Sequence, residues 1–115
     1  MNRGTLFQAV WETYQVRPDY PWKDDNAVLR HRHNRKWFAV VLMVRRDRLG
    51  LSGGDFEDIV NVKLSPELVG FLRGRDGFLP AYHMNKEKWI SIKLDGTVHP
   101  DELMSLLDES YRMTK

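Results

Sequence analysis

The sequence contains no cysteine, which excludes disulfide bonds, thiol nucleophiles and cysteine-ligated zinc or iron–sulfur centres. It also lacks an apolar run of the roughly 18–20 residues that cross a bilayer. The longest apolar run, residues 37–44, has the length of a strand. The first residues, Met-Asn-Arg-Gly, contain no apolar core of a signal peptide. We therefore expect an intracellular, cytoplasmic protein without membrane association.

The chain also carries little excess charge of either sign. The chain has 18 basic and 16 acidic residues, and its formal net charge of +2 is small for a dedicated nucleic-acid-binding protein. The 42% hydrophobic and 30% charged content is typical of a globular protein, and the length suits one domain spanning residues 1–115. The basic side chains are nevertheless clustered, because no acid separates Arg30, Arg32, Arg35 and Lys36.

Catalytic and cofactor motifs are absent. The chain has no Gly-x-Ser-x-Gly elbow, no phosphate-binding glycine loop and no His-Glu-x-x-His helix. His31 and His33 would face the same way on a strand, and His83 is a candidate third nitrogen ligand, but no carboxylate completes a metal site. We therefore expect a protein that is not an enzyme and that binds no metal and no cofactor.

Three helices are predicted from apolar periodicity and end signals. The first covers about residues 4–16, and Thr5 with Gln8 fits a capping box at its start. The second begins at Ser65, a capping residue followed by proline at the first helical position. The third begins at Pro100 and carries acidic residues in its first turn.

The remaining pattern predicts an antiparallel sheet with strands near residues 27–30, 36–44, 49–51, 58–64 and 90–94. Asn34 is expected to take the left-handed conformation of the turn between the first two strands. The fold class is therefore α+β, with the first and last helices packed side by side on one face of the sheet. Trp11 and Phe38 should be buried there, and the other face should be at least partly open.

The segment P-A-Y-H-M-N-K-E-K-W-I-S-I-K-L-D-G at residues 80–96 joins a polar, aromatic loop to an alternating strand. Tyr82 is a candidate for stacking on an unpaired base. His83 and Asn85 could bind base edges or a small ligand, or they could satisfy the backbone of the loop. Trp37 begins an apolar strand, so packing in the core is expected of it.

Six segments follow one another along residues 21–114: P-W-K-D-D, K-W-F-A-V, N-V-K-L-S-P-E-L, P-A-Y-H-M-N-K-E-K-W-I, L-D-G and S-Y-R-M-T. In these segments and in their order the chain resembles the MmcQ/YjbR family. The resemblance implies a compact α+β fold similar to that of the bacterial frataxin homologue. It also implies a proposed role in DNA binding through two hairpins that act as wings, here residues 30–36 and 82–89. An iron role is not carried over, because the first helix holds one acid, Glu12.

We therefore expect a small bacterial binding domain, monomeric, that binds DNA weakly and without sequence preference. Basic wing residues would contact phosphates and lose affinity as salt rises, although such charges also protect a sheet edge from pairing. The alternative is a protein- or small-ligand-binding domain that uses the open sheet face around Tyr82, His83 and Asn85. The candidate nucleic-acid contacts are Arg30, Arg32, Arg35, Lys36, Tyr82, His83, Asn85, Lys86 and Lys88.

Overall fold

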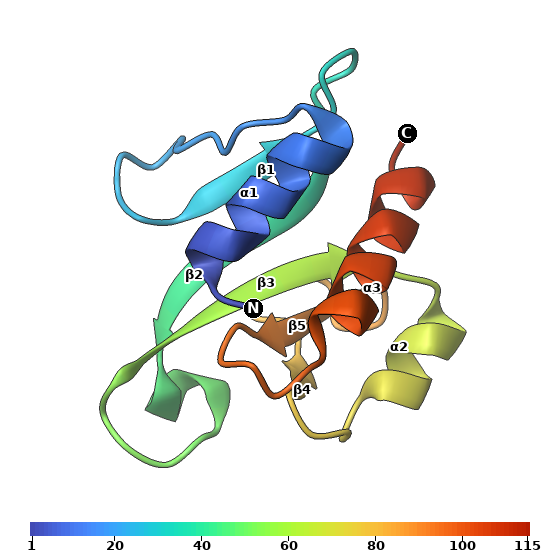
Figure 1. The fold of residues 1–115 in the computed structure, drawn as a ribbon. Coiled ribbons are helices and arrows are strands. Elements are labelled where there is room, and N and C mark those ends of the chain that lie inside the picture. Colours follow the sequence, from blue (N-terminus) through green and yellow to red (C-terminus); the bar gives the residue numbers. More distant parts are fainter.

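The computed structural model describes residues 1–115 and places three α-helices with one five-stranded antiparallel sheet (Figure 1). The strand order is β1-β2-β3-β5-β4, and every neighbouring pair is antiparallel. No helix combines the length and the apolar character that a bilayer crossing requires. The α+β architecture expected from the sequence is confirmed. The elements are α1 (Arg3–Tyr14), β1 (Ala27–Arg30), β2 (Trp37–Arg45), the 3₁₀ helix η1 (Arg46–Leu49), β3 (Phe56–Lys63), α2 (Pro66–Leu72), β4 (Phe78–Pro80), β5 (Trp89–Lys93) and α3 (Pro100–Met113).

Helices α1 and α3 lie side by side over one face of the sheet, as predicted (Figure 1). The ring of Tyr14 in α1 stacks on the ring of Tyr111 in α3, with centroids 4.1 Å apart. The Tyr14 hydroxyl donates to Asp108 Oδ1 at 2.8 Å, and burial together with this bond raises the pKa of Tyr14. The two helices are thus joined by polar and aromatic contacts above a shared core.

Alternation along the strands gives the sheet two different faces. Ala39 and Val41 of β2 join the core under the helices, whereas Val40 lies on the opposite face and is buried outside that core. A β-bulge follows the Leu29–Ala39 pair, so that Arg30 pairs with Trp37 and the intervening Phe38 enters the core. Strand β2 thus contributes buried residues to both faces of the sheet, although Met43 near its end is exposed.

Phe38 is fully buried, as predicted, but the expectation for Trp11 is wrong. Trp11 is only half-buried, and the Arg17 guanidinium lies over its ring at 4.1 Å from the centroid. The expected turn geometry is also shifted by one residue. Arg35, with φ 64°, takes the left-handed conformation that we predicted for Asn34.

Several local details differ from the sequence prediction because caps depend on single side chains. Asn2, not Thr5 with Gln8, caps α1: its side chain accepts from the Thr5 N–H at 2.9 Å, and Thr5 Oγ1 accepts from the Asn2 N–H at 2.9 Å. Helix α1 ends at Tyr14 because Gln15 adopts a left-handed conformation. The predicted strand near residues 49–51 is absent, since the chain forms η1 there, and the short β4 was not predicted.

A candidate ligand-binding face on the sheet

The face of the sheet opposite α1 and α3, called here the second face, is partly covered by two loops. Residues 81–88 connect β4 to β5, and residues 20–26 precede β1. Side chains from both loops meet β2 residues around shallow hollows. Tyr82 and His83 line three of these hollows. The second face is therefore accessible through these hollows, and the two loops cover part of the rest.

The aromatic hollow has a volume of about 470 Å³. Trp22 and Trp37 meet edge to face in it, with ring centroids 6.0 Å apart and an interplanar angle of 86°. Trp37 is half-buried and points to this hollow, so the expectation that it packs in the core is wrong. The full lining is Trp22, Asp24, Asn26, Trp37, Val40, Leu42, Tyr82, His83 and Met84.

Two further hollows adjoin the aromatic hollow and contain basic side chains. The first, about 420 Å³, shares four lining residues with it, namely Asn26, Leu42, Tyr82 and His83, and adds Arg45, Arg48 and Phe56. The second, about 400 Å³, contains Arg48 and Lys86. We call these two together the basic hollows. Arg45 is paired with Asp47 at 3.0 Å, whereas Arg48 and Lys86 have no carboxylate partner.

Tyr82 is held by a buried polar network at the centre of the sheet. Asn61 of β3 and Ser91 of β5 are cross-strand partners, and both are fully buried. Asn61 Nδ2 donates to the Tyr82 carbonyl oxygen at 2.9 Å, and the Tyr82 N–H donates to Ser91 Oγ at 3.0 Å. The Ser91 hydroxyl donates in turn to Asn61 Oδ1. Polar residues inside apolar strands were the sequence signal for this network, and the sequence prediction missed it.

His83 and Asn85 play different parts in the loop. His83 is exposed and has a φ of 59°, a conformation that costs energy for a residue with a Cβ atom and that is common at ligand sites. Asn85 instead closes the loop: its side-chain oxygen accepts from the N–H groups of Glu87 and Lys88 at 2.9 and 3.2 Å. Of the two roles that the sequence left open, Asn85 has the structural one.

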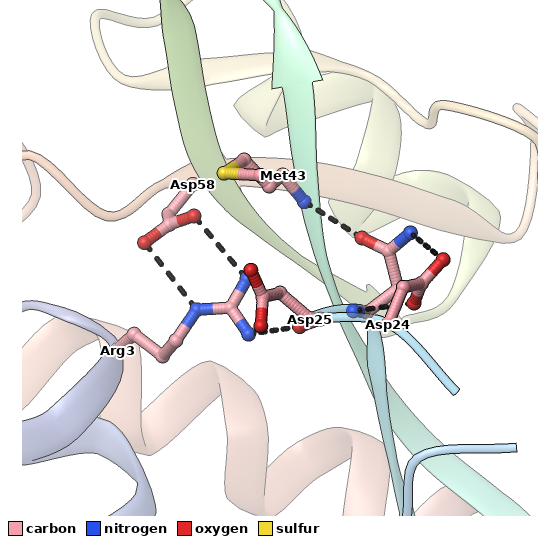
Figure 2. A network of polar contacts seen from close by, with 6 residues as sticks. Arg3, Asp24, Asp25, Met43 and Asp58 are labelled. Carbon is pink, nitrogen blue, oxygen red and sulfur yellow. Dashed lines mark hydrogen bonds and ion pairs between the residues drawn. The ribbon is translucent and has the colours of Figure 1, made fainter. Parts of the chain in front are cut away.

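The loop before β1 is fixed by the polar network in Figure 2. Arg3 of α1 binds Asp58 of β3 through two contacts of 3.2 and 3.4 Å, and it also donates to the Asp25 carbonyl oxygen. Asn26 Oδ1 accepts from the backbone N–H of Met43 at 2.9 Å. These contacts position Asn26, which lines both the aromatic hollow and the larger basic hollow.

The predicted nucleic-acid contacts do not gather in one hollow. Arg30 is half-buried, and its Nε donates to Asp19 at 2.9 Å. Arg32 and Arg35 line a separate hollow together with Arg30. Lys86 lies in a basic hollow beside Arg48. Lys36 and Lys88 are exposed next to the starts of β2 and β5.

Of the histidine pair singled out in the sequence, His31 lies in the core and His33 is exposed. His31 is fully buried, and its Nε2 lies 2.9 Å from Thr114 Oγ1. Its ring packs against Tyr111 and Phe38, with centroids 4.3 and 5.2 Å away. His83 lies in the hollows of the second face, so the three histidines do not form a ligand set.

A family model described as YjbR matches residues 12–113. The chain belongs to the YjbR family. The uncharacterized protein YyaQ of Bacillus subtilis (strain 168) is 41% identical over 117 residues, covering 100% of this chain and 99% of YyaQ. The uncharacterized protein YjbR of Escherichia coli (strain K12) is 37% identical over 54 residues, 46% of each chain.

Solved structures show the same fold. A crystal structure of a Pseudomonas syringae protein, 39% identical, superposes with a TM-score of 0.97 over 100% of both chains. The Deinococcus radiodurans protein DR2400 is 23% identical and has a TM-score of 0.73, over 97% of this chain and 77% of that one, a likeness that shows the fold alone. The resemblance to the YjbR family and its α+β fold is thereby confirmed, and these relatives are bacterial.

Proposed function

We propose that the protein is a non-enzymatic, monomeric binding domain that holds a nucleotide unit on its second face. The observation that carries the proposal is that Tyr82 and His83 line both an aromatic hollow and the two basic ones beside it. A ligand lying across these hollows needs a flat apolar part and a negatively charged part. A base joined to a phosphate combines both in one small molecule.

The aromatic hollow suits the base. Its volume of about 470 Å³ is in the usual range for small-molecule sites. Stacking of one base on an aromatic side chain contributes roughly 1–3 kcal/mol, and the rings of Trp22, Trp37 and Tyr82 all line this hollow. Asp24 adds carboxylate acceptors for the polar edge of the base, and Asn26 Nδ2, which donates one N–H to Asp24 at 3.3 Å, has a second N–H to offer. The charge of Asp24 repels phosphate, which orients the ligand.

The basic hollows suit the phosphate. Arg48 lines both of them and is free of any carboxylate, so its guanidinium is available for a two-pronged hydrogen bond to phosphate oxygens. Lys86 adds a second positive charge in the smaller one. Among the basic residues predicted to contact nucleic acid, Lys86 is therefore the one that supports the proposal on this face.

Tryptophan fluorescence tests the proposal directly. Adenosine 5′-monophosphate (AMP) should quench the emission of the protein saturably, and Tyr82→Ala should weaken binding by about tenfold through lost stacking. Arg48→Gln should weaken binding of AMP but leave binding of adenosine unchanged. Arg112→Gln, which removes the same charge from the exposed side of α3, is the matched control.

Two sources of the nucleotide unit can be separated in the same assay. Tighter, salt-dependent binding of an oligo(dA) strand assigns the face to single-stranded nucleic acid, and equal affinity for AMP and the strand assigns it to free nucleotides. Absence of quenching by both, or full affinity of Tyr82→Ala, would reject the proposal.

A second candidate function is the binding of duplex DNA along one end of the sheet. Lys36 precedes β2, Lys63 ends β3 and Lys88 precedes β5, and the strand register brings these three positions to the same end. Such contacts would be few, so binding would be weak and independent of sequence. The double variant Lys36→Ala with Lys88→Ala should then reduce the slope of log affinity against log salt by about two. An unchanged slope would remove this candidate.

A further inference from the structure

We infer a separate anion site, the arginine hollow, which binds a small molecule carrying two or more phosphate groups. It lies between the end of α1 and the turn that joins β1 to β2, and its volume is about 460 Å³. None of its lining residues takes part in the three hollows of the second face. The lining consists of Trp11, Gln15, Val16, Arg17, Asp19, Arg30, Arg32 and Arg35.

Positive charge is concentrated in the arginine hollow. Four arginines and one aspartate give its lining a formal charge of +3, whereas the whole chain carries only +2. Asp19 accepts from Arg30 at 2.9 Å and lies 3.8 Å from Arg35, so one carboxylate is shared by two guanidinium groups. Arg17 and Arg32 have no carboxylate partner. The hollow therefore carries positive charge that its own carboxylate does not balance and that a bound anion would neutralise.

Two of the guanidinium groups are already held in place. The Arg17 guanidinium stacks over the Trp11 ring at 4.1 Å, which leaves its N–H edge free for oxygen acceptors. Arg30 is fixed between Asp19 and the ring of Trp37, 5.4 Å from its centroid. Positioned, planar guanidinium groups match the oxygen geometry of phosphate and lose little freedom on binding.

The backbone around the arginine hollow is strained on both sides. Gln15 and Arg35 have φ values of 57° and 64°, in the left-handed region that a Cβ atom disfavours. Asn34 would tolerate that conformation better, yet the turn places Arg35 in it. Strain of this kind is typical of sites that present side chains to a ligand.

The lining of the hollow indicates the class of ligand. Its two arginines without a carboxylate partner come from separate segments, Arg17 after α1 and Arg32 between β1 and β2, so its lining can contact more than one phosphate group. The one aromatic ring in the lining, Trp11, is already covered by Arg17, so no slot for a base remains. The geometry thus favours recognition of linked phosphates over recognition of a ring.

Calorimetric titration of the full chain with inorganic pyrophosphate and with phosphate tests this inference. Pyrophosphate should bind saturably and more tightly than phosphate. The double variant Arg17→Gln with Arg32→Gln should lose at least about tenfold in affinity, since each charge-assisted hydrogen bond is worth more than a neutral one. The matched control, Arg75→Gln with Arg112→Gln, removes the same charge from two exposed ion pairs outside all of these hollows and should keep full affinity.

Three outcomes would overturn the inference. The wild-type protein could fail to bind pyrophosphate at low salt, or the control variant could lose as much affinity as the hollow variant. Duplex DNA could also bind through Arg17 and Arg32 without being displaced by pyrophosphate, which would assign these arginines to a nucleic-acid backbone. Circular dichroism of each variant excludes unfolding as the cause of any loss.

Discussion

Asn61 and Tyr82 are joined by a hydrogen bond of 2.9 Å from the Asn61 side-chain amide to the Tyr82 carbonyl oxygen. The bond connects the middle of a central strand to the loop that carries the second-face residues. Together with Ser91, it leaves few conformations open to Tyr82. A ligand on the second face would therefore meet a loop whose backbone is already positioned, which reduces the entropic cost of binding.

Asn61→Ala should lower the free energy of unfolding by about 1–3 kcal/mol, because it leaves the Tyr82 carbonyl and the Ser91 hydroxyl without their buried partner. Urea unfolding measures the loss. Asn34→Ala is the control, since Asn34 is exposed and water can replace its bond to Lys36, so the change should stay within about 0.5 kcal/mol. Equal losses in both variants would show that the buried network contributes no more to the free energy of unfolding than an exposed hydrogen bond does.

Gly77→Ala should be much more destabilising than Gly74→Ala. Both glycines have a φ of 90°, so both substitutions introduce the same backbone strain, of about 1–2 kcal/mol. A Cβ on Gly77 would lie 2.6 Å from Val98 Cγ2, whereas a Cβ on Gly74 would have no atom within 4 Å. The overpacking should add about 1–3 kcal/mol to the loss for Gly77→Ala. Thermal unfolding of the two variants that gave the same midpoint would contradict this packing.

Stability should fall as the pH drops below about 6.5. Burial lowers the pKa of His31 from its ordinary 6.5, and the nearby charges of His33, Lys115 and Lys36 lower it further. Between the two pKa values the unfolded chain binds the proton and the folded chain does not, so the free energy of unfolding decreases with decreasing pH in that window. Urea midpoints at pH 7.5 and 5.5 measure the effect.

The control for this pH dependence replaces one histidine at a time. His31→Gln should flatten the dependence, because glutamine does not titrate and can still bond to Thr114. His83→Gln removes an exposed histidine and should leave the dependence as in the wild type. A steep dependence that persisted in His31→Gln would assign the titration to another group.

Asp95→Asn should reduce stability at neutral pH but not at pH 2. Burial opposes ionisation of Asp95, yet hydrogen bonds from the Thr97 hydroxyl and N–H, with Lys93 at 3.0 Å, lower its pKa to about 2. A lowered folded pKa adds stability above the unfolded value of about 3.9, and this stability is lost as the pH falls toward 2. Because the carboxylate is partly exposed, we expect on the order of 1 kcal/mol at pH 7. Urea unfolding of both proteins across this range should show the difference vanish.

Local signals in the sequence predicted most of the fold. The stripe of Leu6, Val10 and Tyr14 placed α1, and Ser65 followed by Pro66 placed the start of α2, because periodicity and capping act over a few neighbouring residues. The caps and turns were less predictable. The capping box of α1 is formed by Asn2 and Thr5, although the sequence pattern also fits one formed by Thr5 and Gln8. The left-handed residue of the turn between β1 and β2 is Arg35.

The second face could be predicted only in part. Tyr82 and His83 were identified because an aromatic and a histidine stand out in a polar loop. Trp22 and Trp37 are in contact because the β-bulge between β1 and β2 turns the Trp37 indole outward. No local sequence pattern predicts this bulge. DNA binding through two wings would need the basic residues of both segments on one surface, which a sequence cannot show; Arg32 and Arg35 line the arginine hollow, and Lys86 lies beside Arg48. The positions of these side chains depend on contacts between residues far apart in the sequence.

The most direct test of binding on the second face is a ¹H–¹⁵N NMR titration with AMP that follows the four indole N–H signals. Trp22 and Trp37 line the aromatic hollow, Trp11 lines the arginine hollow, and Trp89 lines neither. If AMP binds in the aromatic hollow, the Trp22 and Trp37 signals shift together and saturate, while the Trp89 signal stays in place. AMP binding that moved only Trp11 or Trp89, or a spectrum unchanged at millimolar AMP, would contradict binding in this hollow.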